Sequence, residues 1–103
     1  MKRRTVEVRW EYGLHLRPAA RLVRLGQRFR ATISLRLGER RADLRSILSI
    51  ISLCAMMGTT IDIEAAGEDE DNAVQAIERF FDTGDDDGAA GDGASAPDPG
   101  ERT

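Results

Sequence analysis

The residues whose side chains are best suited to carry out a reaction lie in one short stretch, Gly13 to Ala20. This stretch reads Gly-Leu-His-Leu-Arg-Pro-Ala-Ala. His15 is the only histidine of the chain, and Arg17 follows it two residues later. A neutral imidazole nitrogen is a nucleophile, and a planar guanidinium binds phosphate oxygens in a matching geometry. The stretch therefore combines a nucleophile for a covalent step with a charge that stabilises an anion.

The residues around His15 place it at the start of a helix. Gly13 permits a turn that other residues resist, and Pro18 is tolerated only in the first turn of a helix, so the helix starts near His15 or Leu16. The first N–H groups of that helix, those of Leu16 and Arg17, lack intrahelical partners and carry the positive end of its dipole. The sequence thus predicts an anion-binding site beside the nucleophile.

Two interpretations of His15 remain open at this point. No obvious water-activating base lies near it, so a phosphoryl group bound there would stay until another protein takes it, which favours a carrier over a phosphatase. The alternative is a structural histidine that caps the helix or is buried.

The hydrophobic pattern predicts the elements that position this stretch. Strict alternation predicts strands, and spacings of three and four residues predict helices. We expect an α+β fold of order βαββαβα, an open-faced two-layer sandwich with a four-stranded antiparallel sheet and three helices on one face. The expected ranges are a strand over 5–10, a helix from 15 or 16 to about 29, a hairpin of strands 31–37 and 40–44, a helix over 47–57, a strand over 59–65, and a last helix that follows Asp69 and buries Ala73, Ile77, Phe80 and Phe81. In the strand over 59–65, Ile61 and Ile63 are expected to point inward, and Asp62 and Glu64 outward.

Side chains of the first two helices predict a docking surface around His15. The candidates are Leu16, Ala20, Arg21, Arg24, Ile47, Leu48 and Ile51, with Arg17 at the rim. Apolar side chains ringed by arginines suit transient binding to acidic proteins. The alternative places Ile47 and Ile51 in the core.

Charge is divided along the chain. Residues 1–45 carry a net charge of +9, residues 46–84 carry −7 and residues 85–103 carry −5. The basic part is compatible with a nucleic acid, with an acidic protein partner, or with opposite charges that meet across the fold. A nucleic-acid partner is disfavoured, because the basic residues alternate with core positions and no finger, RRM or OB signature occurs.

The domain prediction is one domain over 1–84 and a disordered acidic tail over 85–103, which lacks the apolar bulk to order itself. Cys54 is the only cysteine, which excludes an internal disulfide, and its apolar neighbours predict a small buried side chain without a metal. Charges interrupt every apolar run near the N-terminus, and the apolar run 47–57 is too short to span a membrane. We therefore expect a cytoplasmic protein with no stable membrane association.

Two motifs carry a resemblance to a known family. Gly13–Ala20 resembles the active-site segment of the HPr family, the histidine-containing phosphocarrier proteins of the phosphoenolpyruvate-dependent sugar phosphotransferase system. Arg45–Leu53 resembles the regulatory serine region of that family, and the segments 58–63 and 67–73 match the end of its domain. The resemblance runs without gaps from about Thr5 to Phe81.

This resemblance implies a relay protein without cofactor or metal, whose catalysis its partners largely supply. Enzyme I would phosphorylate His15 on Nδ1, Arg17 would bind the phosphate, and the phosphoprotein would donate to IIA domains of sugar permeases. Ser46 would match the serine that HPr kinase/phosphorylase modifies, the alternative being a simple helix cap. The implied protein is a monomer that binds no nucleic acid.

The sequence also departs from the family pattern. Trp10-Glu11-Tyr12 is bulky before the histidine, Ser49 stands where the family usually has glycine, and Cys54-Ala55-Met56-Met57 and the tail differ. These departures bear on which partners the protein meets.

Two rival hypotheses stand beside the relay. One is a regulatory protein of the same fold that is controlled at Ser46 and has little role in transport, and the other is a small nucleic-acid binder.

Overall fold

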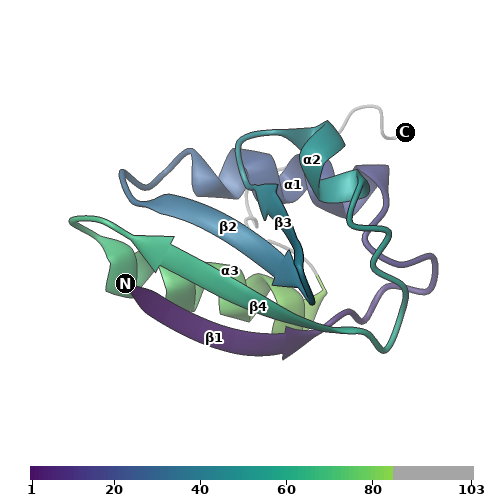
Figure 1. The fold of residues 1–103 in the computed structure, drawn as a ribbon. Coiled ribbons are helices and arrows are strands. Elements are labelled where there is room, and N and C mark those ends of the chain that lie inside the picture. The colour runs from purple at the N-terminus through teal and green to yellow at the C-terminus, as the bar shows by residue number, and fades with distance from the viewer. Residues whose placement is uncertain (85–103) are drawn as a thin grey trace.

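The chain folds into a four-stranded antiparallel sheet with helices on one face, as a computed structural model that describes residues 1–84 shows (Figure 1). The predicted α+β open-faced sandwich is confirmed. The predicted tail, 85–103, lies outside the described residues. The elements are β1 (Lys2–Glu7), α1 (Leu16–Gly26), β2 (Thr32–Leu37), β3 (Arg40–Asp43), α2 (Ile47–Ile51), β4 (Thr60–Ala66) and α3 (Glu70–Thr83).

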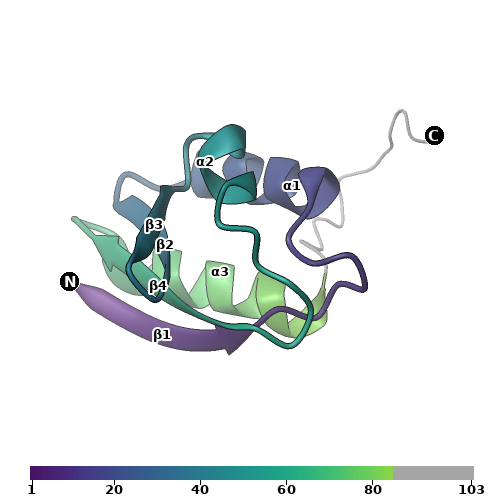
Figure 2. The same cartoon turned by 45° about the vertical axis from the view of Figure 1, so that its right-hand side comes forward.

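The sheet order is β1-β4-β2-β3, so β4 and β2 are the central strands. In the antiparallel register Ile61 of β4 lies opposite Val6, and Ile63 lies opposite Leu35. These apolar side chains point toward the helices, because successive residues of a strand face opposite sides. Figure 1 shows α1 and α3 behind the strands, and in both views α2 lies beside α1 near the end of β3 (Figure 2).

The core lies between the sheet and the helices. Both layers, the sheet and the helices, supply fully buried side chains, and the predicted buried face of α3 is confirmed. The largest of these side chains are Phe80, Phe81, Leu22, Leu35, Leu44, Ile50, Leu53, Ile61, Ile63 and Ile77.

The first strand begins and ends three residues before the predicted range. Lys2 and Arg4 lie on the helix side of β1, where they form ion pairs with Asp71 at 3.4 Å and with Glu78 at 3.6 Å in α3. Since β1 is an edge strand, long charged side chains can lie beside the core with their ends in water. A prediction from hydrophobic alternation does not recognise charged residues on the core side of a strand. The predicted strand therefore began three residues too late.

Both of the first two helices end sooner than predicted. α1 ends at Gly26, and the N–H of Phe29 donates to the carbonyl oxygen of Gly26 at 3.1 Å in a tighter turn. α2 ends at Ile51 rather than Met57, because Cys54 adopts a φ of +54°. This left-handed conformation cannot continue a right-handed helix.

Cys54 is exposed, so the prediction of a buried thiol is wrong. Its left-handed backbone redirects the chain, and the neighbouring Leu53 and Ala55 take the buried positions instead. Met56 and Met57, which the longer helix would have included, are 66% and 59% exposed in the loop before β4.

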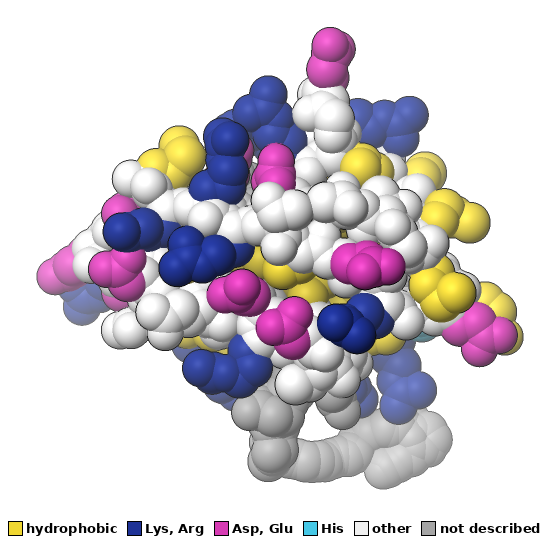
Figure 3. Space-filling model, turned by 90° about the horizontal axis from the view of Figure 1, so that it is seen from below, with side chains coloured by type: hydrophobic (Ala, Val, Ile, Leu, Met, Phe, Trp, Pro, Cys, Tyr) yellow, Lys and Arg dark blue, Asp and Glu magenta, His cyan; other side chains and the backbone are white. Residues whose placement is uncertain are grey.

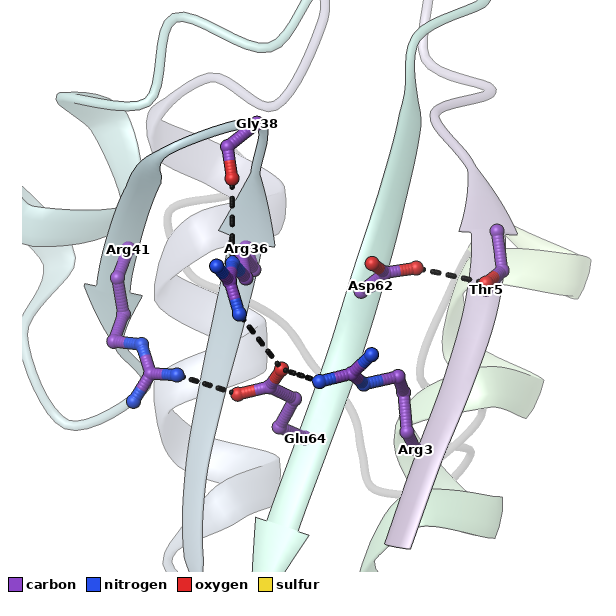
Figure 4. Close-up of polar contacts among 7 residues, drawn as sticks. All are labelled: Arg3, Thr5, Arg36, Gly38, Arg41, Asp62 and Glu64. Atoms are coloured by element: carbon purple, nitrogen blue, oxygen red, sulfur yellow. Dashed lines mark hydrogen bonds and ion pairs between the residues drawn. The ribbon is translucent and has the colours of Figure 1, made fainter.

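The open face of the sheet holds one covered carboxylate. Glu64 points away from the helices, as predicted, but it is only 2% exposed because three arginines lie over it (Figure 4). One carboxylate oxygen lies 2.8 Å from Arg3 and 3.7 Å from Arg36, and the other lies 2.7 Å from Arg41. The arginines come from β1, β2 and β3, so this cluster links the other three strands to β4.

Opposite charges meet across the fold. Within residues 1–84, every described ion pair except that of Arg45 with Asp43 joins the basic first part of the chain to the acidic second part. Part of the charge asymmetry of the sequence is thus neutralised inside the domain.

Candidate functional site

His15 occupies the N-cap position of α1, as the sequence predicts. Its backbone is extended, with φ −89° and ψ −167°, and its carbonyl oxygen accepts the N–H of Ala19 at 3.0 Å. Its own N–H donates to the carbonyl oxygen of Gly13 at 2.9 Å. The imidazole makes no capping hydrogen bond, and His15 is partly exposed.

The turn before His15 depends on a glycine. Gly13 has a φ of +76°, and a β carbon at this position would lie 2.4 Å from the carbonyl oxygen of Ala55. The same oxygen accepts the N–H of Leu14 at 2.8 Å. The loop before α1 is therefore packed directly on the loop before β4.

The start of α1 can bind an anion beside His15. Within the described residues, the N–H groups of Leu16 and Arg17 have no hydrogen-bond acceptor, and the first turn of the helix contains no acidic residue. The Arg17 side chain is exposed and forms no ion pair within residues 1–84. Two N–H donors and the positive end of a helix dipole thus follow His15 directly, and Arg17 adds a guanidinium to the same first turn.

The predicted docking residues lie on two neighbouring helices, because α2 packs against α1. Leu16 is 62% exposed and Leu48 is 76% exposed. Arg24 is exposed, whereas Ala20 and Arg21 are half-buried. Each helix thus supplies one largely exposed apolar side chain, Leu16 from α1 and Leu48 from α2.

Ile47 and Ile51 contribute less to this surface. Both are half-buried and pack against the hydrophobic core, which agrees with the alternative that the sequence left open. Their side chains therefore add little to the exposed apolar surface of α2.

Sequence reasoning missed three exposed apolar residues near His15. Tyr12, Met56 and Met57 are 76%, 66% and 59% exposed, and they lie in the two loops that Gly13 joins. Figure 3, a view from below that of Figure 1, shows hydrophobic side chains gathered at the right-hand edge, while acidic and basic side chains intermix over the middle. The sequence did hold a sign of this surface, because the segments 10–12 and 54–57 differ from the family pattern.

Ser46 is the N-cap of α2, as predicted, and its Oγ accepts the N–H of Ser49 at 3.1 Å. The Oγ of Ser49 in turn accepts the N–H of Asp43 at 3.0 Å. The Ser49 side chain therefore links α2 to the end of β3 by a hydrogen bond that a glycine could not make. Ser46 is half-buried.

An open-faced sandwich with its single histidine at the first helix start is the arrangement of a phosphocarrier protein. Residues 2–83 match the family model described as PTS HPr component phosphorylation site. The chain belongs to this HPr family of the phosphotransferase system.

Several relatives illustrate the range of the family. The chain is 38% identical over 82 residues to the phosphocarrier protein NPr of Proteus mirabilis, covering 79% of this chain and 91% of NPr. It is 44% identical over 68 residues to the phosphoryl donor subunit DhaM of the PEP-dependent dihydroxyacetone kinase of Providencia stuartii, covering 66% of this chain but only 14% of DhaM. The crystal structure of HPr-C-His from Thermoanaerobacter tengcongensis is similar with a TM-score of 0.77 at 31% identity, covering 81% and 93% of the two chains.

Residues 1–84 show neither a membrane-spanning helix nor a metal-binding cluster. No helix there is long and apolar enough to cross a membrane. In the same range, no group of three or more histidine, cysteine, aspartate or glutamate side chains lies close enough together to hold a metal ion.

Proposed function

We propose that this chain relays a phosphoryl group from phospho-enzyme I to IIA domains of sugar permeases through a phosphohistidine at Nδ1 of His15. The observation that carries the proposal is the position of His15 at the N-terminus of α1, next to the N–H groups of Leu16 and Arg17 that lack acceptors within the described residues. The proposed relay is a cytoplasmic monomer.

The proposed transfer is a displacement at phosphorus. The lone pair of Nδ1 forms the new bond to phosphorus, the bond from phosphorus to the donor group of enzyme I breaks, and its electron pair leaves with the donor. The same step in the opposite sense passes the group to the next acceptor. No bond to water forms, so the group is conserved between the two proteins.

The residues around His15 stabilise charge during this displacement. The N–H groups of Leu16 and Arg17 and the guanidinium of Arg17 face negative charge on the phosphoryl oxygens, and fixed donors need no reorganisation as the reaction proceeds. Arg17 is exposed, so its guanidinium is accessible to a phosphoryl group at His15.

The proposed partner surface surrounds this site. We assign Leu16 and Leu48 to it as exposed apolar contacts, the half-buried Ala20, Ile47 and Ile51 as further apolar members, and Arg21 and Arg24 as charged members. A few exposed apolar side chains give moderate affinity, while the arginines raise the rate of association with an acidic partner. This combination suits a protein that must bind a partner and then dissociate from it.

A regulatory role of Ser46 is a second part of the proposal. A kinase such as HPr kinase/phosphorylase would transfer a phosphoryl group to the Ser46 hydroxyl, next to the exposed Leu48. A phosphate at a helix N-cap is electrostatically tolerated, but it makes an apolar docking surface anionic and weakens binding to acidic partners. A chain whose function is mainly regulatory would be labelled from ATP at Ser46 and transfer little to IIA domains.

Incubation with enzyme I and phosphoenolpyruvate tests the proposal. We expect an acid-labile, base-stable label on the wild-type chain, none on His15→Ala, and loss of the label when a IIA domain is added. Arg17→Lys keeps the charge but not the forked geometry, and we expect it to be labelled about tenfold more slowly. An unlabelled wild-type chain would refute the relay.

Two further assays separate the rival functions. Acid-stable label from ATP that disappears in Ser46→Ala would favour regulation as the main role. Salt-sensitive retention on nucleic acid, together with no phosphoryl transfer, would favour the nucleic-acid binder.

A further inference from the structure

Within the described residues, the His15 ring has one aromatic contact. The imidazole makes no capping hydrogen bond to α1, and its described ring contact is with Tyr12. The two ring centroids are 6.2 Å apart, and the ring planes are at 82°, an edge-to-face arrangement. Such a pair is attractive because the positive edge of one ring meets the negative face of the other.

Tyr12 is itself held in place by the turn that contains it. The N–H of Gly13 donates to the carbonyl oxygen of Trp10 at 2.8 Å, so Glu11 and Tyr12 occupy the tip of a closed four-residue turn. The Tyr12 side chain is 76% exposed and lies on the outer side of this turn. A closed turn restricts where the ring can lie relative to His15.

Trp10 anchors the turn on α3. Its indole packs against Phe80 and Phe81, with ring centroids 5.4 Å and 5.3 Å away. Its Nε1–H donates to the carbonyl oxygen of Gly84 at 2.8 Å. One side of the turn is therefore attached to the C-terminal end of α3, and the other side is attached to Ala55 through Leu14.

We propose that Tyr12 is a positioning residue for His15, and that Trp10 keeps Tyr12 in the place where its ring limits the orientations of the imidazole. This inference rests on the proposed function, since it concerns the geometry of phosphoryl transfer at His15. A ring that already points its nitrogen at the incoming phosphorus loses less orientational freedom when the partner binds. The Tyr12 hydroxyl has no part in this role, so a phenylalanine serves equally well.

The first test uses the unphosphorylated protein and NMR of the His15 ring. In Tyr12→Phe we expect the ring proton shifts and side-chain couplings of the wild type. In Tyr12→Ala we expect shifts that move toward those of a free histidine and couplings averaged over several rotamers. Because Tyr12 is largely exposed, both variants should retain the wild-type amide spectrum elsewhere. Unchanged His15 couplings in Tyr12→Ala would overturn the proposal.

The second test measures phosphorylation by enzyme I at varied concentrations of each variant. We expect Tyr12→Ala to lower kcat about two- to tenfold with little change in KM, and Tyr12→Phe to restore the wild-type kcat. Trp10→Phe keeps an aromatic ring but loses the bond to Gly84, and its kcat should fall between the two. A rise in KM alone would make Tyr12 a partner contact and overturn the positioning role.

The two tests distinguish the inference from the function on which it rests. If the wild-type chain accepts no phosphoryl group, the proposed function fails. The NMR comparison still reports whether Tyr12 orients His15, because it needs no transfer.

Discussion

A β carbon on Gly13 would lie 2.4 Å from the carbonyl oxygen of Ala55, 42 positions further along the chain. That oxygen already accepts the N–H of Leu14 at 2.8 Å, one residue before His15. The path of the backbone into α1 is thus determined by contact with the loop before β4. The place of His15 depends on the absence of a side chain at position 13.

Gly13→Ala tests this contact, with Gly38→Ala as its control. Both glycines have positive φ, at +76° and +63°, but a β carbon on Gly38 would meet nothing within 4 Å. We expect Gly38→Ala to lower the free energy of unfolding by about 1 kcal/mol and Gly13→Ala by at least about 2 kcal/mol, because only the latter adds a clash with backbone. Urea unfolding measures both, and equal losses would show that the close approach to Ala55 costs nothing.

The cluster on the open face predicts an unequal response of two acidic residues of β4. Glu64 is covered by three arginines, whereas Asp62 accepts an exposed hydrogen bond from the Thr5 hydroxyl at 2.7 Å (Figure 4). Glu64→Gln should lower the free energy of unfolding by about 2 kcal/mol, because it removes the charge that the arginines face. Asp62→Asn should cost less than about 1 kcal/mol. Similar losses in the two variants would contradict the structural role of the cluster.

Asp69 predicts how stability depends on acid pH. Backbone N–H groups of Arg30, at 2.9 Å, and Ala31, at 2.8 Å, donate to its carboxylate, and the Arg30 bond is the main reason that the pKa of Asp69 is lowered in the folded protein. A lowered pKa gives stability that is complete above the unfolded pKa of about 4 and is lost as pH falls through the folded value.

We therefore expect Asp69→Asn to be less stable than the wild type at pH 7, with a gap that narrows as pH falls below about 4. Urea unfolding at a series of pH values measures the gap. A gap of constant size over this range would mean that the charge of Asp69 contributes nothing.

Leu48 should matter for partner binding and not for folding. Its side chain is 76% exposed, so Leu48→Ser should change the free energy of unfolding by less than about 0.5 kcal/mol. We expect KM for phosphorylation by enzyme I to rise about tenfold, because an apolar contact at the centre of the docking surface is lost. Gln75→Ser, at an exposed position of α3, is the control and should leave KM unchanged. An equal rise in both variants would argue against a docking surface on α2.

Local chemistry explains what could be predicted from the sequence. Pro18 and Gly13 place the start of α1 within one residue, because each acts on the backbone near it. Alternation with a turn at Gly38 likewise predicts the hairpin of β2 and β3. These short-range effects were sufficient to predict that His15 lies at the start of a helix.

Long-range contacts explain what the sequence did not reveal. Glu64 is buried only because arginines from three other strands converge on it. The exposure of Met56 and Met57 follows from the left-handed conformation of Cys54, for which the apolar run gave no sign. Tyr12 lies beside His15 because Trp10 is attached to the far end of α3, a contact between residues 74 positions apart.

The most direct test of the central claim is NMR of the chain after incubation with phosphoenolpyruvate and a catalytic amount of enzyme I. Phosphorus and nitrogen spectra identify the atom that carries the phosphoryl group. The relay predicts one phosphoramidate signal at Nδ1 of His15 that disappears when a IIA domain is added. No phosphoramidate signal, or a phosphate ester at Ser46 in its place, would contradict it.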